Sequence, residues 1–128
     1  MVDLSQLRFT ENHEWIRGKG NKWFVGITDY AQKDITDVVF VELPPIGKEI
    51  KAGEEVMTIE SVKAVFSIYA PASGKIVEVN QRLQDDPAVI NNSPYEEGWI
   101  FAIEVAHSEE VTDLMDHQQY QEFVSKGE

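Results

Sequence analysis

Cysteine is absent from this chain of 128 residues, and basic residues are scarce, with 11 Lys and Arg against 23 Asp and Glu. Without cysteine, the polypeptide offers no disulfide framework, no zinc ribbon, no iron–sulfur ligands and no thiol nucleophile. The net charge of −12 argues against binding to nucleic acid, whose phosphates require basic patches, and disfavours anionic membrane surfaces. Any sulfur redox chemistry must therefore come from a group added to the chain.

Long apolar runs are also missing. No run approaches the roughly 18 residues of a membrane span, and residues 1–8 lack the basic region and apolar stretch of a signal peptide. We therefore expect a cytoplasmic protein that neither enters a membrane nor binds nucleic acid. Hydrophobic residues nevertheless make up 42% of the chain, which predicts a folded protein, and the length predicts one domain over residues 1–128.

Alternating apolar residues predict short strands, because successive strand side chains point to opposite faces. Such alternation occurs in residues 23–27, 39–43, 64–69 and 99–105, and Val39, Val41 and Leu43 are expected on one face. Strands at this spacing indicate an all-β fold, a flattened barrel or a sandwich of two antiparallel sheets.

Two segments have a helical pattern instead. A short helix is predicted near residues 29–34, with Thr28 or Asp29 able to cap its start. The tail, about residues 108–126, is predicted to be helical and to pack on the strands. Asp116 and Gln119 have the spacing of a capping box, which predicts a break near Asp116-His117 and a second short helix beyond it.

Lys63 lies between two β-prone runs, so a hairpin would place it at or beside the turn, exposed to solvent. From spacing alone, an ordinary surface lysine is the simpler interpretation. The three histidines lack metal-ligand spacing, and Ser61 and Ser93 lack an associated base in any order typical of a nucleophile. We therefore expect no metal site and no catalytic residue.

The sequence Glu60-Ser61-Val62-Lys63-Ala64 resembles the lipoyl-attachment sequence of the H-proteins of the glycine cleavage system. Other segments resemble the same family in the same order: His13-Glu14-Trp15, Gly26–Gln32, Asp37–Pro44, Pro71–Gly74, Glu78–Asn80, Leu83, Pro87, Ile90-Asn91, Ser93–Tyr95 and Gly98-Trp99.

The neighbours of the lysine distinguish this family from other carriers. Biotin carriers place their lysine between two methionines, and lipoyl domains of 2-oxoacid dehydrogenases usually place Asp before it. Lys63 instead lies between Val62 and Ala64, as in H-proteins. The chain departs from the family pattern at Thr36, where glycine is usual, and at Ser67, where some members carry Asp.

The resemblance implies a lipoyl/biotinyl-domain-like fold of the hybrid-motif type, with a lipoyl-binding core over about residues 22–105. It implies (R)-lipoate attached to Lys63 as an amide, with Glu60, Ser61, Val62 and Ala64 as the attachment motif. The arm would carry an aminomethyl group from the P-protein, which decarboxylates glycine, to the T-protein, and the L-protein would reoxidise it. Lipoate-attaching enzymes are further implied partners, and the chain would be a monomeric carrier, not an enzyme.

A loaded arm needs shelter, because a carbon held between sulfur and nitrogen is prone to hydrolysis. A cationic amine in a cleft also needs a carboxylate partner. By resemblance, Glu14 is that partner, and Asn12 is able to add a hydrogen bond. Four residues are predicted to form the apolar wall, although each could equally be plain core: Trp15, Ile27, Ala31 and Ile35.

Two other functions use the same lysine or the same fold. A lipoyl-relay protein would donate its lipoyl group to 2-oxoacid dehydrogenases, and its sequence would differ little from that of a glycine-cleavage shuttle. An unmodified binding module would use the β-fold as a docking surface and would not depend on Lys63. An independent enzyme has the least support, because no catalytic constellation accompanies the fold.

Overall fold

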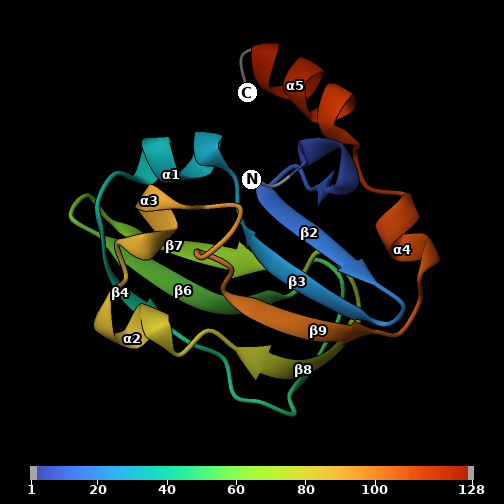
Figure 1. Cartoon of the computed structure of the whole chain (residues 1–128), viewed down its shortest axis with the longest axis horizontal. Coiled ribbons are helices and arrows are strands. Elements are labelled where there is room, and N and C mark those ends of the chain that lie inside the picture. Colours follow the sequence, from blue (N-terminus) through green and yellow to red (C-terminus); the bar gives the residue numbers. More distant parts are fainter. Residues whose placement is uncertain (1–2, 127–128) are drawn as a thin grey trace.

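The computed structural model describes residues 3–126 and, within them, every side chain except that of Lys19. Two antiparallel sheets form the fold (Figure 1). The larger has the order β1 (Arg8–Phe9), β2 (Glu14–Lys19), β3 (Lys22–Ile27), β9 (Phe101–Val105), β8 (Gly74–Val79) and β5 (Glu49–Ile50). The smaller has the order β4 (Val38–Glu42), β6 (Glu55–Ser61) and β7 (Val65–Tyr69).

The predicted all-β sandwich is thus confirmed, and the sheets do not close into a barrel. The inward side chains of both sheets form the main core, in which Ile16, Ile59, Ile76 and Ile103 have no exposed surface. Removing such apolar surface from water is the dominant favourable contribution to folding. A second, smaller core contains Leu7, Phe9, Trp15 and Tyr120.

Strand β4 corrects one prediction. Its pairing with β6 is irregular between Val38 and Phe40, where one strand carries an extra residue. Such a bulge shifts the alternation, because side-chain direction has a period of two. Val38 and Val41 consequently face the core, whereas Val39 and Phe40 are 49% and 53% exposed. The expectation that Val39 and Val41 share one half-buried face is therefore wrong.

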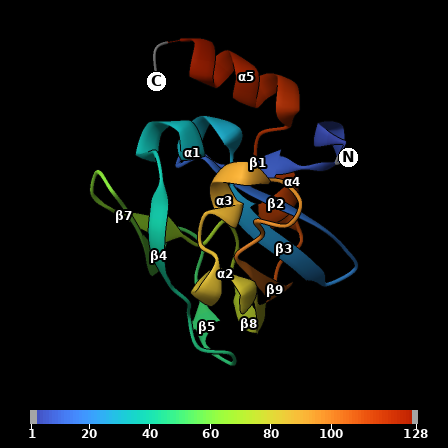
Figure 2. The same ribbon diagram turned by 60° about the vertical axis from the view of Figure 1, so that its left-hand side comes forward.

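Helices α1 (Asp29–Ile35) and α5 (His117–Ser125) lie above the sheets in Figure 1, and the remaining helices lie on opposite sides of the sandwich (Figures 1 and 2). Helix α1 is confirmed, and the Thr28 side chain caps it by accepting the N–H of Ala31. The tail forms α4 (Glu109–Thr112) and α5, with the predicted capping box of Asp116 and Gln119 at the start of α5. Helix α5 packs on β1 and the second core.

Two short helices, α2 (Arg82–Asp85) and α3 (Val89–Asn92), lie where no helix is predicted, and α3 packs against α1. Each is a single turn, too short for an apolar periodicity to be visible. Across the described residues 3–126, no helix has the length and apolar character that crossing a membrane requires.

Candidate functional site

Lys63 lies in the turn between β6 and β7, as predicted. Strand pairing extends to Glu60 and Val65, and the Ser61 N–H donates to the Ala64 carbonyl at 2.9 Å. Residues 62–64, called the hairpin turn below, are all exposed. An amine at this position is open to a modifying enzyme from the solvent side.

The Ser61 side chain holds the hairpin turn from inside. It is only 5% exposed, and its Oγ accepts the N–H groups of Lys63 and Ala64 at 3.0 and 3.2 Å. A serine hydroxyl in this position supplies the acceptor that the turn amides otherwise lack. The sequence alone indicates Ser61 only as a member of the attachment motif.

The hairpin turn also contacts the end of α1 and the residues that follow it. The Val62 N–H donates to the Asp37 carbonyl, and the Lys63 Nζ donates to the Asp34 carbonyl, each at 3.0 Å. The last carbonyls of a helix lack intrahelical partners and carry the negative end of its dipole, so an ammonium group is favoured there. The unmodified Lys63 side chain therefore reaches back across the turn to α1.

Thr36, directly after α1, has an unusual backbone conformation, with φ 65° and ψ −151°. This region is populated almost only by glycine, because a Cβ atom crowds the backbone there. The family's usual glycine at this position thus has a physical reason, and Thr36 is strained. Thr36 and Asp37, called the α1–β4 connection below, join α1 to β4 beside the hairpin turn.

A cleft of about 380 Å³ opens between α1, β7 and the turn before β2. This volume lies in the range of small-molecule pockets. Asp34, whose carbonyl accepts the Lys63 ammonium, is one of its lining residues, so the cleft adjoins the end of that side chain. The full lining, called the α1 cleft below, is Asn12, His13, Ile27, Tyr30, Ala31, Asp34, Ile35, Ile59, Phe66, Ser67 and Ile68.

Four of the six residues predicted to surround the arm are in this lining: Asn12, Ile27, Ala31 and Ile35. Trp15 is not, since it is fully buried in the second core and its Nε1 donates to the Pro94 carbonyl at 2.9 Å. Its role in this structure is packing. Tyr30, Phe66 and Ile68 line the cleft but were not predicted, because alternation alone does not reveal which apolar faces border an opening.

Glu14 also lies outside the lining of the α1 cleft. It is 1% exposed, with its carboxylate accepting the Thr10 hydroxyl at 2.7 Å and the Tyr69 N–H at 2.9 Å. It borders a second hollow, of about 470 Å³, and Asn12 lines both spaces. Burial raises the pKa of Glu14 to about 7, although both hydrogen bonds act in the opposite direction.

His13 packs at the rim of the α1 cleft. Its Nδ1 lies 2.8 Å from the Tyr120 hydroxyl, and its ring lies 4.7 Å from that of Tyr30. The Tyr120 hydroxyl also lies 2.7 Å from the Thr28 hydroxyl, which connects α5 to the cap of α1. Over residues 3–126 no three His, Cys, Asp or Glu side chains are grouped in a way that would hold a metal ion.

Comparison with known proteins gives one consistent family. The family model described as "Glycine cleavage H-protein" matches residues 7–127. The glycine cleavage system H protein of Geobacillus sp. (strain WCH70) is 48% identical over 122 residues, covering 95% of this chain and 96% of that one. That of Thermotoga maritima is 49% identical over 123 residues, covering 96% and 99%.

A solved structure agrees. The crystal structure of a glycine cleavage system H protein from Mycobacterium marinum superposes with a TM-score of 0.84 at 36% identity, covering 95% of this chain and 96% of that one. Both the sequence matches and the fold match thus extend over nearly the whole length of the proteins compared. The chain belongs to the glycine cleavage H-protein family.

Proposed function

We propose that this chain carries (R)-lipoate as an amide on Lys63 and shuttles the aminomethyl group of glycine between the enzymes of glycine cleavage. The single observation that carries the proposal is the position of Lys63, exposed on a fixed hairpin turn beside the α1 cleft, in a chain of this family. When bound, the lipoyl group supplies the two redox-active sulfurs that a chain without cysteine lacks.

The residues around Lys63 fit an acyl arm. The ε-amine provides the nitrogen for an amide bond, and the four-carbon stem lengthens the arm. Apolar side chains of β3, α1 and β7 make the floor of the cleft suitable for a saturated chain, because burying such a chain is favourable. The residues concerned are Ile27, Ala31, Ile35, Phe66 and Ile68.

The chain's own contribution is to position and shelter the arm. Ser61 and the Asp37 carbonyl hold the hairpin turn. The α1 cleft reduces contact with water, and Asn12 at its rim offers a polar group. Glu14 stabilises this wall of the cleft because its carboxylate accepts the N–H of Tyr69, which follows the lining residue Ile68 in β7. The pairing of Glu14 with an amine stays a prediction from the family resemblance.

The partners proposed for the arm are the P-, T- and L-proteins and a lipoate-attaching enzyme. Glu60, exposed at the end of β6, presents a charge that such an enzyme could read. In this scheme the chain is a monomeric, cytoplasmic, non-catalytic carrier. The folded unit would comprise a lipoyl-binding core over about residues 22–105 and the helical tail over about residues 108–126.

Mass spectrometry of the protein purified from its own host tests the proposal. The intact mass should exceed that of the polypeptide by one lipoyl group in amide linkage, and peptide mapping should locate it on Lys63. The Lys63→Arg variant, which keeps the charge, should remain unmodified. A lysine that is always unmodified in the native host would overturn the proposal.

Growth on glycine as the one-carbon source separates the shuttle from its alternatives. A Lys63→Ala variant should fail to complement a strain that lacks its own H-protein. Full complementation would support an unmodified docking module instead. If 2-oxoacid dehydrogenases lost lipoylation in the variant strain while glycine cleavage continued, the chain would be a lipoyl relay.

A further inference from the structure

Asn91, the third residue of α3, binds the segment that joins α1 to β4. Its Nδ2 donates to the Thr36 carbonyl at 2.8 Å and to the Gln32 Oε1 at 3.1 Å, and its Oδ1 accepts the Val38 N–H at 2.9 Å. One side-chain amide thus makes three hydrogen bonds, which reach α1, the residue after it and the first residue of β4. Asn91 does not line the α1 cleft.

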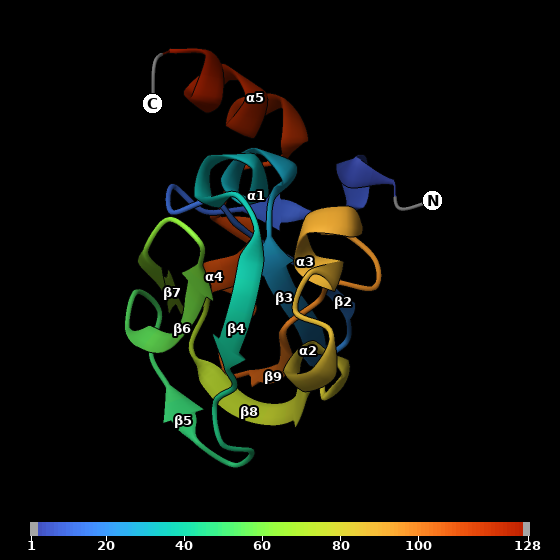
Figure 3. The ribbon, with the colours of Figure 1, turned by 90° about the vertical axis from the view of Figure 1, so that its left-hand side faces the viewer.

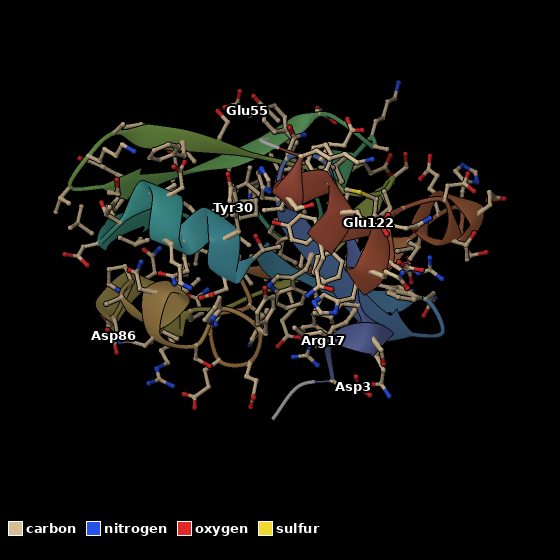
Figure 4. The ribbon with its side chains drawn as sticks, turned by 90° about the horizontal axis from the view of Figure 1, so that it is seen from above. Asp3, Arg17, Tyr30, Glu55, Asp86 and Glu122 are labelled. Atoms are coloured by element: carbon tan, nitrogen blue, oxygen red, sulfur yellow. The ribbon has the colours of Figure 1, made fainter. Side chains whose placement is uncertain are left out.

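The same segment supports the hairpin turn on its other side. The Asp37 carbonyl, which accepts the Val62 N–H, lies between the two residues whose backbone Asn91 holds. The Asp34 carbonyl, which accepts the Lys63 ammonium, lies two residues before Thr36. Figure 3 shows α3 on one side of β4 and the β6–β7 hairpin on the other. Seen from above, α1 lies between the hairpin and α2 with α3 (Figure 4).

The strained backbone of Thr36 explains why the α1–β4 connection needs hydrogen bonds from another element. A β-branched residue at φ 65° is strained and stays so only where the surrounding structure fixes it. The Asn91 amide binds the carbonyl of Thr36 and the N–H of Val38, on both sides of Asp37. Without these bonds the connection could relax, and the Asp37 carbonyl would move away from the hairpin turn.

We propose that Asn91 is a positioning residue for Lys63, acting through the α1–β4 connection. Its amide fixes the Asp37 carbonyl, which fixes the Val62 N–H and hence the orientation in which the hairpin turn meets a lipoate-attaching enzyme. The part of the proposal that concerns this enzyme rests on the proposed function. The part that concerns the hairpin turn does not require lipoylation.

Asn80 provides a matched control elsewhere in the chain. Its Nδ2 donates to the Glu97 and Trp99 carbonyls at 2.9 and 2.7 Å, and its Oδ1 accepts the Arg82 N–H at 3.3 Å. Like Asn91, it holds backbone segments through both ends of its amide. None of these partners belongs to the hairpin turn or to the α1–β4 connection. Asn80→Asp therefore removes equivalent donors and leaves the hydrogen bonds of Asn91 in place.

The experiment compares Asn91→Asp, Asn91→Ala and Asn80→Asp with the wild-type chain. NMR would follow the exchange of the Val62 amide with water relative to the core amide of Ile103. We expect the Asn91 variants to raise this relative exchange by about tenfold, the equivalent of one hydrogen bond. The kcat/KM for attachment of lipoate by a purified lipoate ligase should fall by about fivefold or more, chiefly through KM. Asn80→Asp should change both quantities by less than about twofold.

The outcomes are separable. If Val62 exchange were unchanged in both Asn91 variants, or rose equally in Asn80→Asp, the proposal that Asn91 holds the α1–β4 connection would be overturned. Faster Val62 exchange with an unchanged attachment rate would overturn the positioning role. If the wild-type chain accepted no lipoate, the proposed function would fail, and the exchange measurement would still decide whether Asn91 holds the hairpin turn. Asn91→Ala, which adds no charge, provides the test if Asn91→Asp does not fold.

Discussion

Glu14 joins the two sheets through one carboxyl group. It belongs to β2 of the larger sheet, and its Oε2 accepts the N–H of Tyr69 from β7 of the smaller sheet. At this edge the sandwich is not closed by strand pairing, so a side chain supplies the acceptor that a neighbouring strand would otherwise provide. The carboxyl group is nearly inaccessible to water, which disfavours its charged form.

The raised pKa of Glu14 predicts a pH-dependent stability. The pKa rises from 4.5 to about 7 on folding, so the folded protein binds this proton more tightly. The associated stability is complete below about pH 4.5 and is lost as the pH rises to about 7, amounting to about 3 kcal/mol. Glu14→Gln stays neutral at every pH. The difference between its free energy of unfolding and that of the wild type should therefore grow as the pH rises from about 4.5 to about 7.

Urea unfolding at a series of pH values measures this difference. Glu11→Gln, which removes an exposed charge from the turn before β2, controls for the change in net charge. A difference between Glu14→Gln and the wild type that does not vary with pH would contradict the expected proton linkage.

Thr36 predicts a stabilising substitution. Glycine at this position would relieve strain of about 1–3 kcal/mol, offset by roughly 0.5–1 kcal/mol of additional chain entropy in the unfolded state. Thr36→Gly should therefore raise the free energy of unfolding by about 1 kcal/mol, as measured in urea at constant pH. Thr36→Ala keeps the Cβ atom and should bring no such gain. An equal gain from both variants would show that the backbone is not strained.

At the level of elements, the sequence predicts features whose signals are local. The Thr28 cap, the capping box at Asp116 and the position of Lys63 between two strands all depend on residues within a few positions of one another. The bulge in β4 and the contacts of Asn91 with α1 and β4 depend on how distant segments pack. Trp15 is predicted either as cleft wall or as plain core, and its burial in the second core depends on the direction of a strand side chain, which the sequence alone does not reveal.

In the β6–β7 hairpin, the hydrogen bonds of Ser61 predict that its side chain stabilises the turn. Ser61→Ala removes the acceptor of two turn amides and should lower the free energy of unfolding by about 1–2 kcal/mol. Amide exchange of Lys63 and Ala64 should accelerate more than that of core residues. Ser67→Ala, a hydroxyl on β7 outside the hairpin turn, is the control. The role would be refuted if both variants gave equal stability and equal exchange at the turn.

At the level of the whole molecule, acidic residues outnumber basic ones by 23 to 11, which gives a net charge of −12. Four of the acidic residues, Asp3, Glu55, Asp86 and Glu122, lie at separate places on the molecule (Figure 4). In the proposed function, the chain would have to bind each partner enzyme quickly and leave it quickly. Long-range attraction to basic patches on such partners would accelerate encounter more than it strengthens the final complex.

This charge predicts that encounters weaken with salt. Screening shortens the Debye length from about 30 Å at 0.01 M to about 8 Å at 0.15 M ionic strength. The rate constant for association with a partner enzyme should fall by about tenfold over this range, while kcat at saturation changes little. Stopped-flow mixing with each partner measures the rate. Turnover that is insensitive to salt with every partner would count against electrostatic steering.

The bond between the Lys63 ammonium and the Asp34 carbonyl bears on the order of events at the hairpin turn. Before modification, a positive charge holds the side chain against the negative end of α1. Acylation of Nζ would replace the ammonium with a neutral amide that keeps one N–H, so the charge-dependent part of this attraction would be lost. In the proposed function, attaching the acyl group would therefore weaken the contact that holds the Lys63 side chain against α1, and the modified side chain would move more freely than the unmodified one.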